Sequence, residues 1–128
     1  MSVGMNTTTS NQNGSINNKA SVLWLDIKEK ASLHLAYMPF IDRGGIFIPT
    51  SKPYKIGDEI FMLLNLLDDP VKSNLAGKVV WVNPVAQAGK PQGIGVQFNN
   101  DANGLALKNK IEVLLGGLIS SNRPTHTI

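Results

Sequence analysis

The sequence predicts a mainly β domain, an antiparallel barrel or sandwich that is followed by one C-terminal α-helix. Three observations support this class. Short apolar runs of strand length recur along the chain, turn-forming residues separate them, and the apolar period becomes helical only near the end. A length of 128 residues with 42% hydrophobic content is enough for one core. Successive short strands joined by tight turns favour a closed or two-layered β architecture.

Composition divides the chain into three parts. Residues 1–19 are rich in Asn, Ser and Thr and have few apolar groups, so we expect a disordered N-terminal tail. Residues 20–118 contain the expected folded domain. Residues 119–128 are polar and irregular in pattern, and we expect them to form a C-terminal tail.

Six runs of the domain have strand character. The first two, residues 22–27 and 31–37, flank Lys28-Glu29-Lys30 and predict a hairpin. Residues 45–48 and 59–66 are the next two, and Asp68-Asp69-Pro70 ends the latter as a turn. The last two are residues 75–82 and 93–98, with a loop between them.

The spacing of the apolar residues changes after residue 98. Apolar side chains then recur at the spacing of one face of an amphipathic helix, at Leu107, Ile111, Leu114, Leu115 and Leu118. Asp101 or Asn103 can cap the start of this helix, and Gly116-Gly117 weakens its end. We expect this helix to pack its apolar stripe on the barrel or to cover an open edge.

Composition argues against several functions. The chain has no cysteine, so we expect neither a disulfide nor a thiolate site, and no metal cluster or cofactor motif is evident. The net charge of +3 comes from dispersed lysines, which does not predict a nucleic-acid surface. No apolar run is long enough for a membrane span and no leader is evident, so we expect a cytoplasmic location. We also expect a monomer.

Catalytic patterns are equally weak. His34 alternates with leucines in an expected strand, where it would face solvent or accept a hydrogen bond, and His126 lies in the tail. Asp68-Asp69 precedes a proline and is interpreted as a turn, not as a carboxylate pair. No spacing suggests a nucleophile with its base or a phosphate-binding loop. The sequence therefore predicts a protein that is not an enzyme.

The most informative segment is residues 37–50, YMPFIDRGGIFIPT. A large apolar cluster is followed by a charged turn with two glycines and then by a strand. Glycine supplies the positive φ of tight turns, and Pro39 restrains Met38 to extended conformations. Such a turn either packs into the core or is offered to a partner.

Five blocks in this order resemble a PilZ domain, and most closely the single-domain members that act in type IV pilus assembly. The blocks are MPFIDRGGIFIPT, YKIGDEIFMLLNLLDDP, GKVVWVNP, GIGVQF and RPTHTI. The resemblance covers residues 21–128. It implies a six-stranded antiparallel β-barrel with a C-terminal α-helix.

The chain departs from the nucleotide-binding motifs of that family. By resemblance, PilZ domains bind cyclic di-GMP with an R-x-x-x-R pair and a (D/N)-x-S-x-x-G turn. Residues 1–42 contain no arginine. If Gly45 is the last glycine of the turn motif, Phe40 and Asp42 occupy its acid and serine positions. Each lost charge-assisted hydrogen bond costs about 1.5–3 kcal/mol, so we expect no direct binding of cyclic di-GMP.

The resemblance then implies an adaptor. Its partners would be the pilus assembly ATPase and a FimX-type regulator with degenerate GGDEF and EAL domains, of which the EAL domain binds cyclic di-GMP. The candidate contact surface is Tyr37, Met38, Pro39 and Phe40, because Tyr and Met are enriched at interfaces. The alternative is that Met38 and Phe40 plug the barrel end. Exposed apolar residues of edge strands, or the tail at residues 123–128, are further candidate contacts. A sensor of cyclic di-GMP with a non-standard site is the alternative function.

Overall fold

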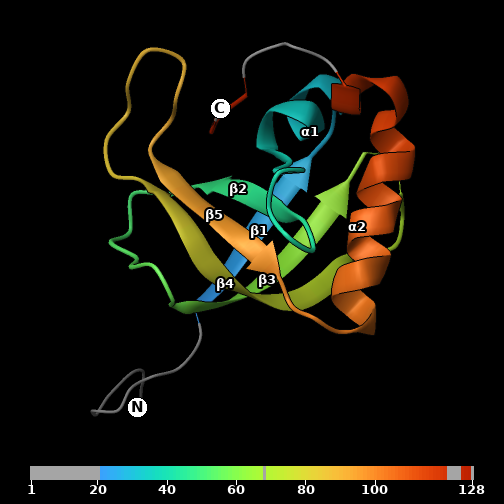
Figure 1. Ribbon diagram of the computed structural model, residues 1–128, viewed down its shortest axis with the longest axis horizontal. Coiled ribbons are helices and arrows are strands. Elements are labelled where there is room, and N and C mark those ends of the chain that lie inside the picture. Colours follow the sequence, from blue (N-terminus) through green and yellow to red (C-terminus); the bar gives the residue numbers. More distant parts are fainter. Residues whose placement is uncertain (1–20, 68, 121–124, 128) are drawn as a thin grey trace.

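One curled sheet with two helices on its concave side makes up the described part of the chain, residues 21–67, 69–120 and 125–127 of a computed structural model (Figure 1). The tail expected at residues 1–19 lies outside these residues. The elements, in chain order, are β1 (Ser21–Ile27), α1 (Lys30–Ala36), β2 (Gly45–Pro49), β3 (Glu59–Leu66), β4 (Ser73–Asn83), β5 (Gly93–Phe98), α2 (Ala102–Leu115) and a final 3-10 turn, Gly116–Ser120.

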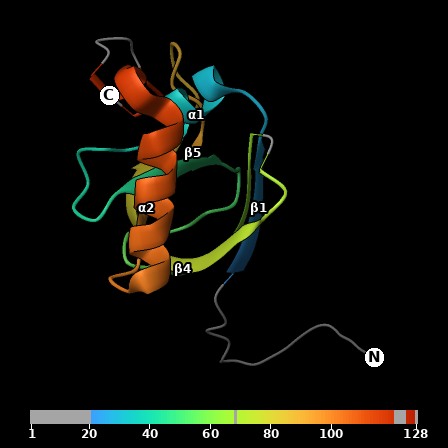
Figure 2. The ribbon, with the colours of Figure 1, turned by 90° about the vertical axis from the view of Figure 1, so that its right-hand side faces the viewer.

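The sheet has the strand order β1-β3-β4-β5-β2. β3, β4 and β5 form an antiparallel meander, β2 joins β5 antiparallel, and β1 lies parallel to β3. The sheet curls into a half-barrel whose edges are β1 and β2 (Figure 2). The mainly β class and the C-terminal helix are confirmed. The expected six-stranded, fully antiparallel barrel is not: the described residues form five strands, and one pair is parallel.

The expected strand at residues 31–37 is wrong, and with it the hairpin. This segment forms α1, which carries the chain from β1 across to the far edge of the sheet. Helical spacing brings Leu33, Ala36 and Tyr37 to one buried face, which the strand pattern would have split between two faces. The segment also contains no β-branched residue and consists largely of good helix formers.

Helix α2 follows the expected pattern closely. The Asp101 side chain caps it by accepting a hydrogen bond from the backbone N–H of Gly104 at 2.9 Å. Leu107, Ile111 and Leu115 are buried in the core, and Leu114 and Leu118 pack partly against it. Burying such side chains is the main source of stability in a domain of this size. The helix ends at Gly116, whose φ of 53° is costly for other residues.

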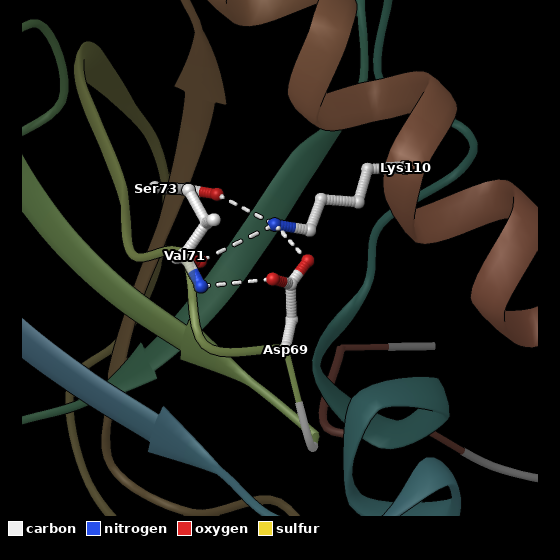
Figure 3. Close-up of polar contacts among 4 residues, drawn as sticks. All are labelled: Asp69, Val71, Ser73 and Lys110. Atoms are coloured by element: carbon white, nitrogen blue, oxygen red, sulfur yellow. Dashed lines mark hydrogen bonds and ion pairs between the residues drawn. The ribbon is translucent and has the colours of Figure 1, made fainter.

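An ion pair fixes α2 to the loop between β3 and β4 (Figure 3). The Lys110 Nζ lies 2.6 Å from the Asp69 Oδ2, and the other carboxylate oxygen accepts a hydrogen bond from the backbone N–H of Val71 at 2.9 Å. The hydrogen bond from Lys110 is the main reason why the pKa of Asp69 lies below its usual value. Asp69 thus has a structural role, as its interpretation as a turn residue predicts.

Candidate functional site

The turn between α1 and β2 is a closed, hydrogen-bonded unit. The backbone N–H of Met38 donates to the carbonyl of Gly45 at 2.9 Å, and that of Gly44 donates to the carbonyl of Ile41 at 2.8 Å. Arg43 and Gly44 both adopt left-handed conformations, with φ of 67° and 80°. These bonds hold the intervening residues in one shape, so the turn presents a preformed surface.

The first half of the candidate contact surface is buried, which contradicts its expected exposure. Tyr37 is 1% exposed and Met38 is 0% exposed. The Tyr37 hydroxyl donates a 2.7 Å hydrogen bond to the Glu112 carboxylate of α2. Burial, followed by this bond, raises the pKa of Tyr37, and the same bond lowers the pKa of Glu112. Tyr37 therefore ties the end of α1 to α2.

The second half, Pro39 and Phe40, is exposed. Phe40 is 46% exposed, and its ring meets the half-buried Trp81 edge to face, with centroids 5.7 Å apart and planes at 64°. The Trp81 indole N–H donates to the side-chain oxygen of Asn83 at 2.8 Å, which fixes the indole in place. Phe40 and Trp81 thus form an aromatic pair at the surface, and Phe40 does not plug the barrel end.

Two glycines of β5 leave the space in which this aromatic pair and its neighbours pack. Phe47 and Trp81 are both register partners of Gly95, one on each side. A Cβ at Gly95 would lie 2.6 Å from the Met38 sulfur and 2.8 Å from the Trp81 Cβ. Gly93 in the same way leaves room for the Phe47 ring. The G-x-G pattern therefore makes space for a small cluster on the convex face of the sheet, outside the main core.

The C-terminal segment at residues 125–127 packs against this cluster. The His126 ring lies 5.3 Å from the Phe47 ring, and the His126 backbone N–H donates to the carbonyl of Leu35 at 3.0 Å. The Asn83 amide donates to the His126 carbonyl, and Lys90 to that of Thr125. Burial, and then the charge of Lys90, lowers the pKa of His126.

The electrostatics of the turn are unsuited to a phosphate. The Arg43 guanidinium lies 3.7 Å from the Asp42 carboxylate, so the one cation of the turn already has an anion beside it. Arg43 also lines a cavity of about 240 Å³ together with Asn99, Asn100, Asp101, Ala102, Leu105 and Lys108. This volume lies below the roughly 300–1,000 Å³ usual for small-molecule pockets.

The other polar candidates show no catalytic arrangement. His34 is buried in α1, which corrects its expected position on a strand. Within residues 21–67, 69–120 and 125–127, no three His, Cys, Asp or Glu side chains gather as a metal site would require. The helices of this same part are all too short or too polar to cross a bilayer.

Comparison with known families shows to which family this chain belongs. The model of the PilZ domain matches residues 20–116, which is most of the chain. The chain belongs to the PilZ domain family. PilZ domains are typically non-enzymatic adaptors or effectors, and membership suggests a role in signalling that is related to cyclic di-GMP. No curated protein matches the chain.

Sequence reasoning placed the turn of this PilZ domain correctly but missed its partner residue. Trp81 is flanked by valines in the sequence, and a bulge in β4 between Val79 and Trp81 leaves it half-buried beside Phe40. The available signal was Gly95, since a glycine inside a strand often marks close packing of large side chains. Trp24, in contrast, lies on the edge strand β1.

Proposed function

We propose that this PilZ domain is a non-enzymatic adaptor of type IV pilus assembly and twitching motility. It acts through contacts with the pilus assembly ATPase and with a FimX-type EAL-domain regulator, and it does not itself bind cyclic di-GMP. The observation that supports the proposal best is the exposed Phe40–Trp81 pair on a preformed turn. Exposed aromatic anchors with fixed geometry dominate many protein interfaces.

The same turn argues against direct nucleotide binding. Its position for an acid or amide is Phe40, which packs on Trp81, and its position for a serine is Asp42, a carboxylate that repels phosphate. The sequence supplies only two arginines in all, Arg43 and Arg123, and none precedes β1. A bis-phosphate ligand needs paired cations or forks of N–H donors. The proposed signal therefore reaches the chain through the regulator.

A cytoplasmic location follows from these proposed partners, because an assembly ATPase and a nucleotide-binding regulator both act where nucleotides are available. The proposal also makes the protein a monomer that bridges two different partners. The second partner then needs a surface separate from the turn.

Calorimetry separates the adaptor from a cyclic di-GMP sensor. The cavity beside Arg43 and Lys108 is a feature that favours the sensor. Titration of the full chain with cyclic di-GMP is expected to give no saturable heat up to about 100 μM, well above a micromolar affinity. Saturable binding below about 10 μM that Arg43→Ala or Lys108→Ala abolishes would establish the sensor instead.

A further inference from the structure

The free edge of β1 has backbone groups available for another strand. Among the residues that the structure describes, β1 lies at the end of the sheet and pairs only with β3. The carbonyl of Ile27 accepts a hydrogen bond from the N–H of Leu67, so the backbone groups of Ile27 point towards β3. Successive residues of a strand point their N–H and C=O groups to opposite sides. Those of Val22, Trp24 and Asp26 therefore point away from β3.

The convex face beside this edge is apolar. Val22 is the register partner of Phe61, and Trp24 is that of Leu63. Val22, Trp24 and Phe61 are 49%, 66% and 40% exposed, and Leu63 is half-buried. We call these four residues the edge patch. Their neighbours Leu23, Met62 and Leu64 face the core, which shows that the edge patch lies on the outside of the sheet. Contiguous exposed apolar side chains are a mark of binding surfaces.

One cation lies directly on the edge patch. Near the end of β1, the Lys28 Nζ lies 3.8 Å from the Asp26 carboxylate. The Lys72 Nζ lies 5.7 Å from the centre of the Trp24 ring. Among the residues that the structure describes, no carboxylate lies within ion-pair distance of Lys72. The surface is thus an apolar strip with a cation at Trp24 that has no ion-pair partner among the described residues.

We propose that β1 and the edge patch form a second docking surface, which binds an extended segment of a partner protein as an added strand. The segment has alternating apolar residues and a carboxylate that pairs with Lys72. Its backbone bonds to Val22, Trp24 and Asp26, and its apolar side chains on the convex side extend the edge patch. This surface involves no residue of the turn at Phe40 and goes beyond the contacts proposed for that turn.

Charge distinguishes such a segment from a second copy of this chain. An antiparallel β1–β1 pair centred on Trp24 would place the two Trp24 side chains beside each other, and with them the two Lys72 ammonium groups. Like charges brought together oppose pairing, whereas a carboxylate on a different segment stabilises it. The cation at Trp24 therefore favours an acidic, extended partner over a second copy.

Selection from a library of random decapeptides, displayed on phage against the full chain, tests this surface. The expected peptides alternate apolar residues with others and contain Asp or Glu. Synthetic copies should bind Trp24→Lys and Lys72→Glu at least about tenfold more weakly, a loss of about 1.4 kcal/mol. Trp24→Pro should weaken binding further than Trp24→Ala, because only proline also removes the N–H that points to the free edge. Val113→Ala, on an exposed face of α2, is the matched control.

Further variants distinguish peptide binding at the edge patch from binding at the turn. Phe40→Ala should leave peptide affinity unchanged, and near-ultraviolet circular dichroism verifies that each variant is folded. Failure to enrich any peptide, or equal affinity for Trp24→Lys and the parent chain, would overturn the proposal. Concentration-dependent dimers that Trp24→Lys abolishes would likewise overturn it, since the occupant would then be a second copy. A loss confined to Phe40→Ala would assign the peptides to the turn.

Discussion

Two adjacent halves of one apolar segment differ in burial in this PilZ domain. Tyr37 and Met38 are buried, the first between α1 and α2 and the second beneath the turn against Gly95. Pro39 and Phe40 follow directly and are exposed, with Phe40 packed edge to face on Trp81. The first half packs in the protein and holds the turn in place, and the second half lies on the surface of the turn. A run of apolar residues can therefore change from buried to exposed within four positions.

The difference arises from backbone geometry more than from residue type. α1 ends at Ala36, and Tyr37 then forms an isolated bridge with Ile46, which directs its side chain into the core. The restraint of Pro39 and the bond from Met38 to Gly45 turn the chain away immediately afterwards. Substitutions in the two halves should separate stability from binding, and four predictions use this separation.

The largest effect is expected for Tyr37→Ala. The substitution removes a fully buried aromatic ring and its bond to Glu112, so the free energy of unfolding should fall by about 3–5 kcal/mol. Urea denaturation followed by tryptophan fluorescence measures this value. A change below about 1 kcal/mol would show that Tyr37 is not an anchor.

Met38→Ala should have the next largest effect on stability. It opens a cavity over Gly95 and beside Trp81, at an expected cost of about 2–3 kcal/mol. The substitution Met38→Leu, of similar volume, should cost less than about 1.5 kcal/mol and serves as the control. Equal losses for both variants would mean that the sulfur, and not the filled volume, is what this site requires.

Tyr37→Phe isolates the hydrogen bond to Glu112. Because the acceptor is ionised but partly exposed, we expect a loss of about 1–1.5 kcal/mol at pH 7. The bond lowers the pKa of Glu112, so its contribution is present above the ordinary carboxyl pKa and is lost as pH falls through the folded value. The stability difference between Tyr37→Phe and the parent chain should therefore shrink in acid. A difference that is constant from pH 7 to pH 3 contradicts this assignment.

Phe40→Ala should have the smallest effect on stability. A half-exposed ring with one aromatic neighbour contributes about 0.5–1 kcal/mol. Thermal unfolding of the variant is expected to remain cooperative, with a midpoint a few degrees lower at most. A loss as large as that of Tyr37→Ala would place Phe40 in the fold and remove it from the proposed interface.

Much of this fold could be predicted from periodicity, but α1 could not be placed correctly. Leu33, Leu35 and Tyr37 alternate as in a strand, while Leu33, Ala36 and Tyr37 have helical spacing, and a seven-residue segment satisfies both patterns. Composition was the better guide there, since the segment lacks β-branched residues. The parallel pairing of β1 with β3 was missed because of that error, since two adjacent strands would have formed a hairpin.

The site could be predicted in part. The turn was identified from Pro39 and the glycine pair, but the exposure of single side chains depends on contacts made far along the chain. Glu112 lies 75 residues from Tyr37 and reaches it only when α2 packs on the sheet. The His126 ring likewise contacts the Phe47 ring, although the two residues are far apart in the sequence. Spacing along a sequence does not record such contacts.

The most direct test of the central claim is binding of the pilus assembly ATPase to three variants of the full chain. Biolayer interferometry with the immobilised ATPase compares Phe40→Ala, Tyr37→Phe and Val85→Ala, the last an exposed control in the loop between β4 and β5. We expect Phe40→Ala to weaken binding by at least about 30-fold, the 2 kcal/mol typical of an interface anchor, while the other two bind like the parent chain. Unchanged affinity of a folded Phe40→Ala variant would contradict the assignment of the turn as the contact surface.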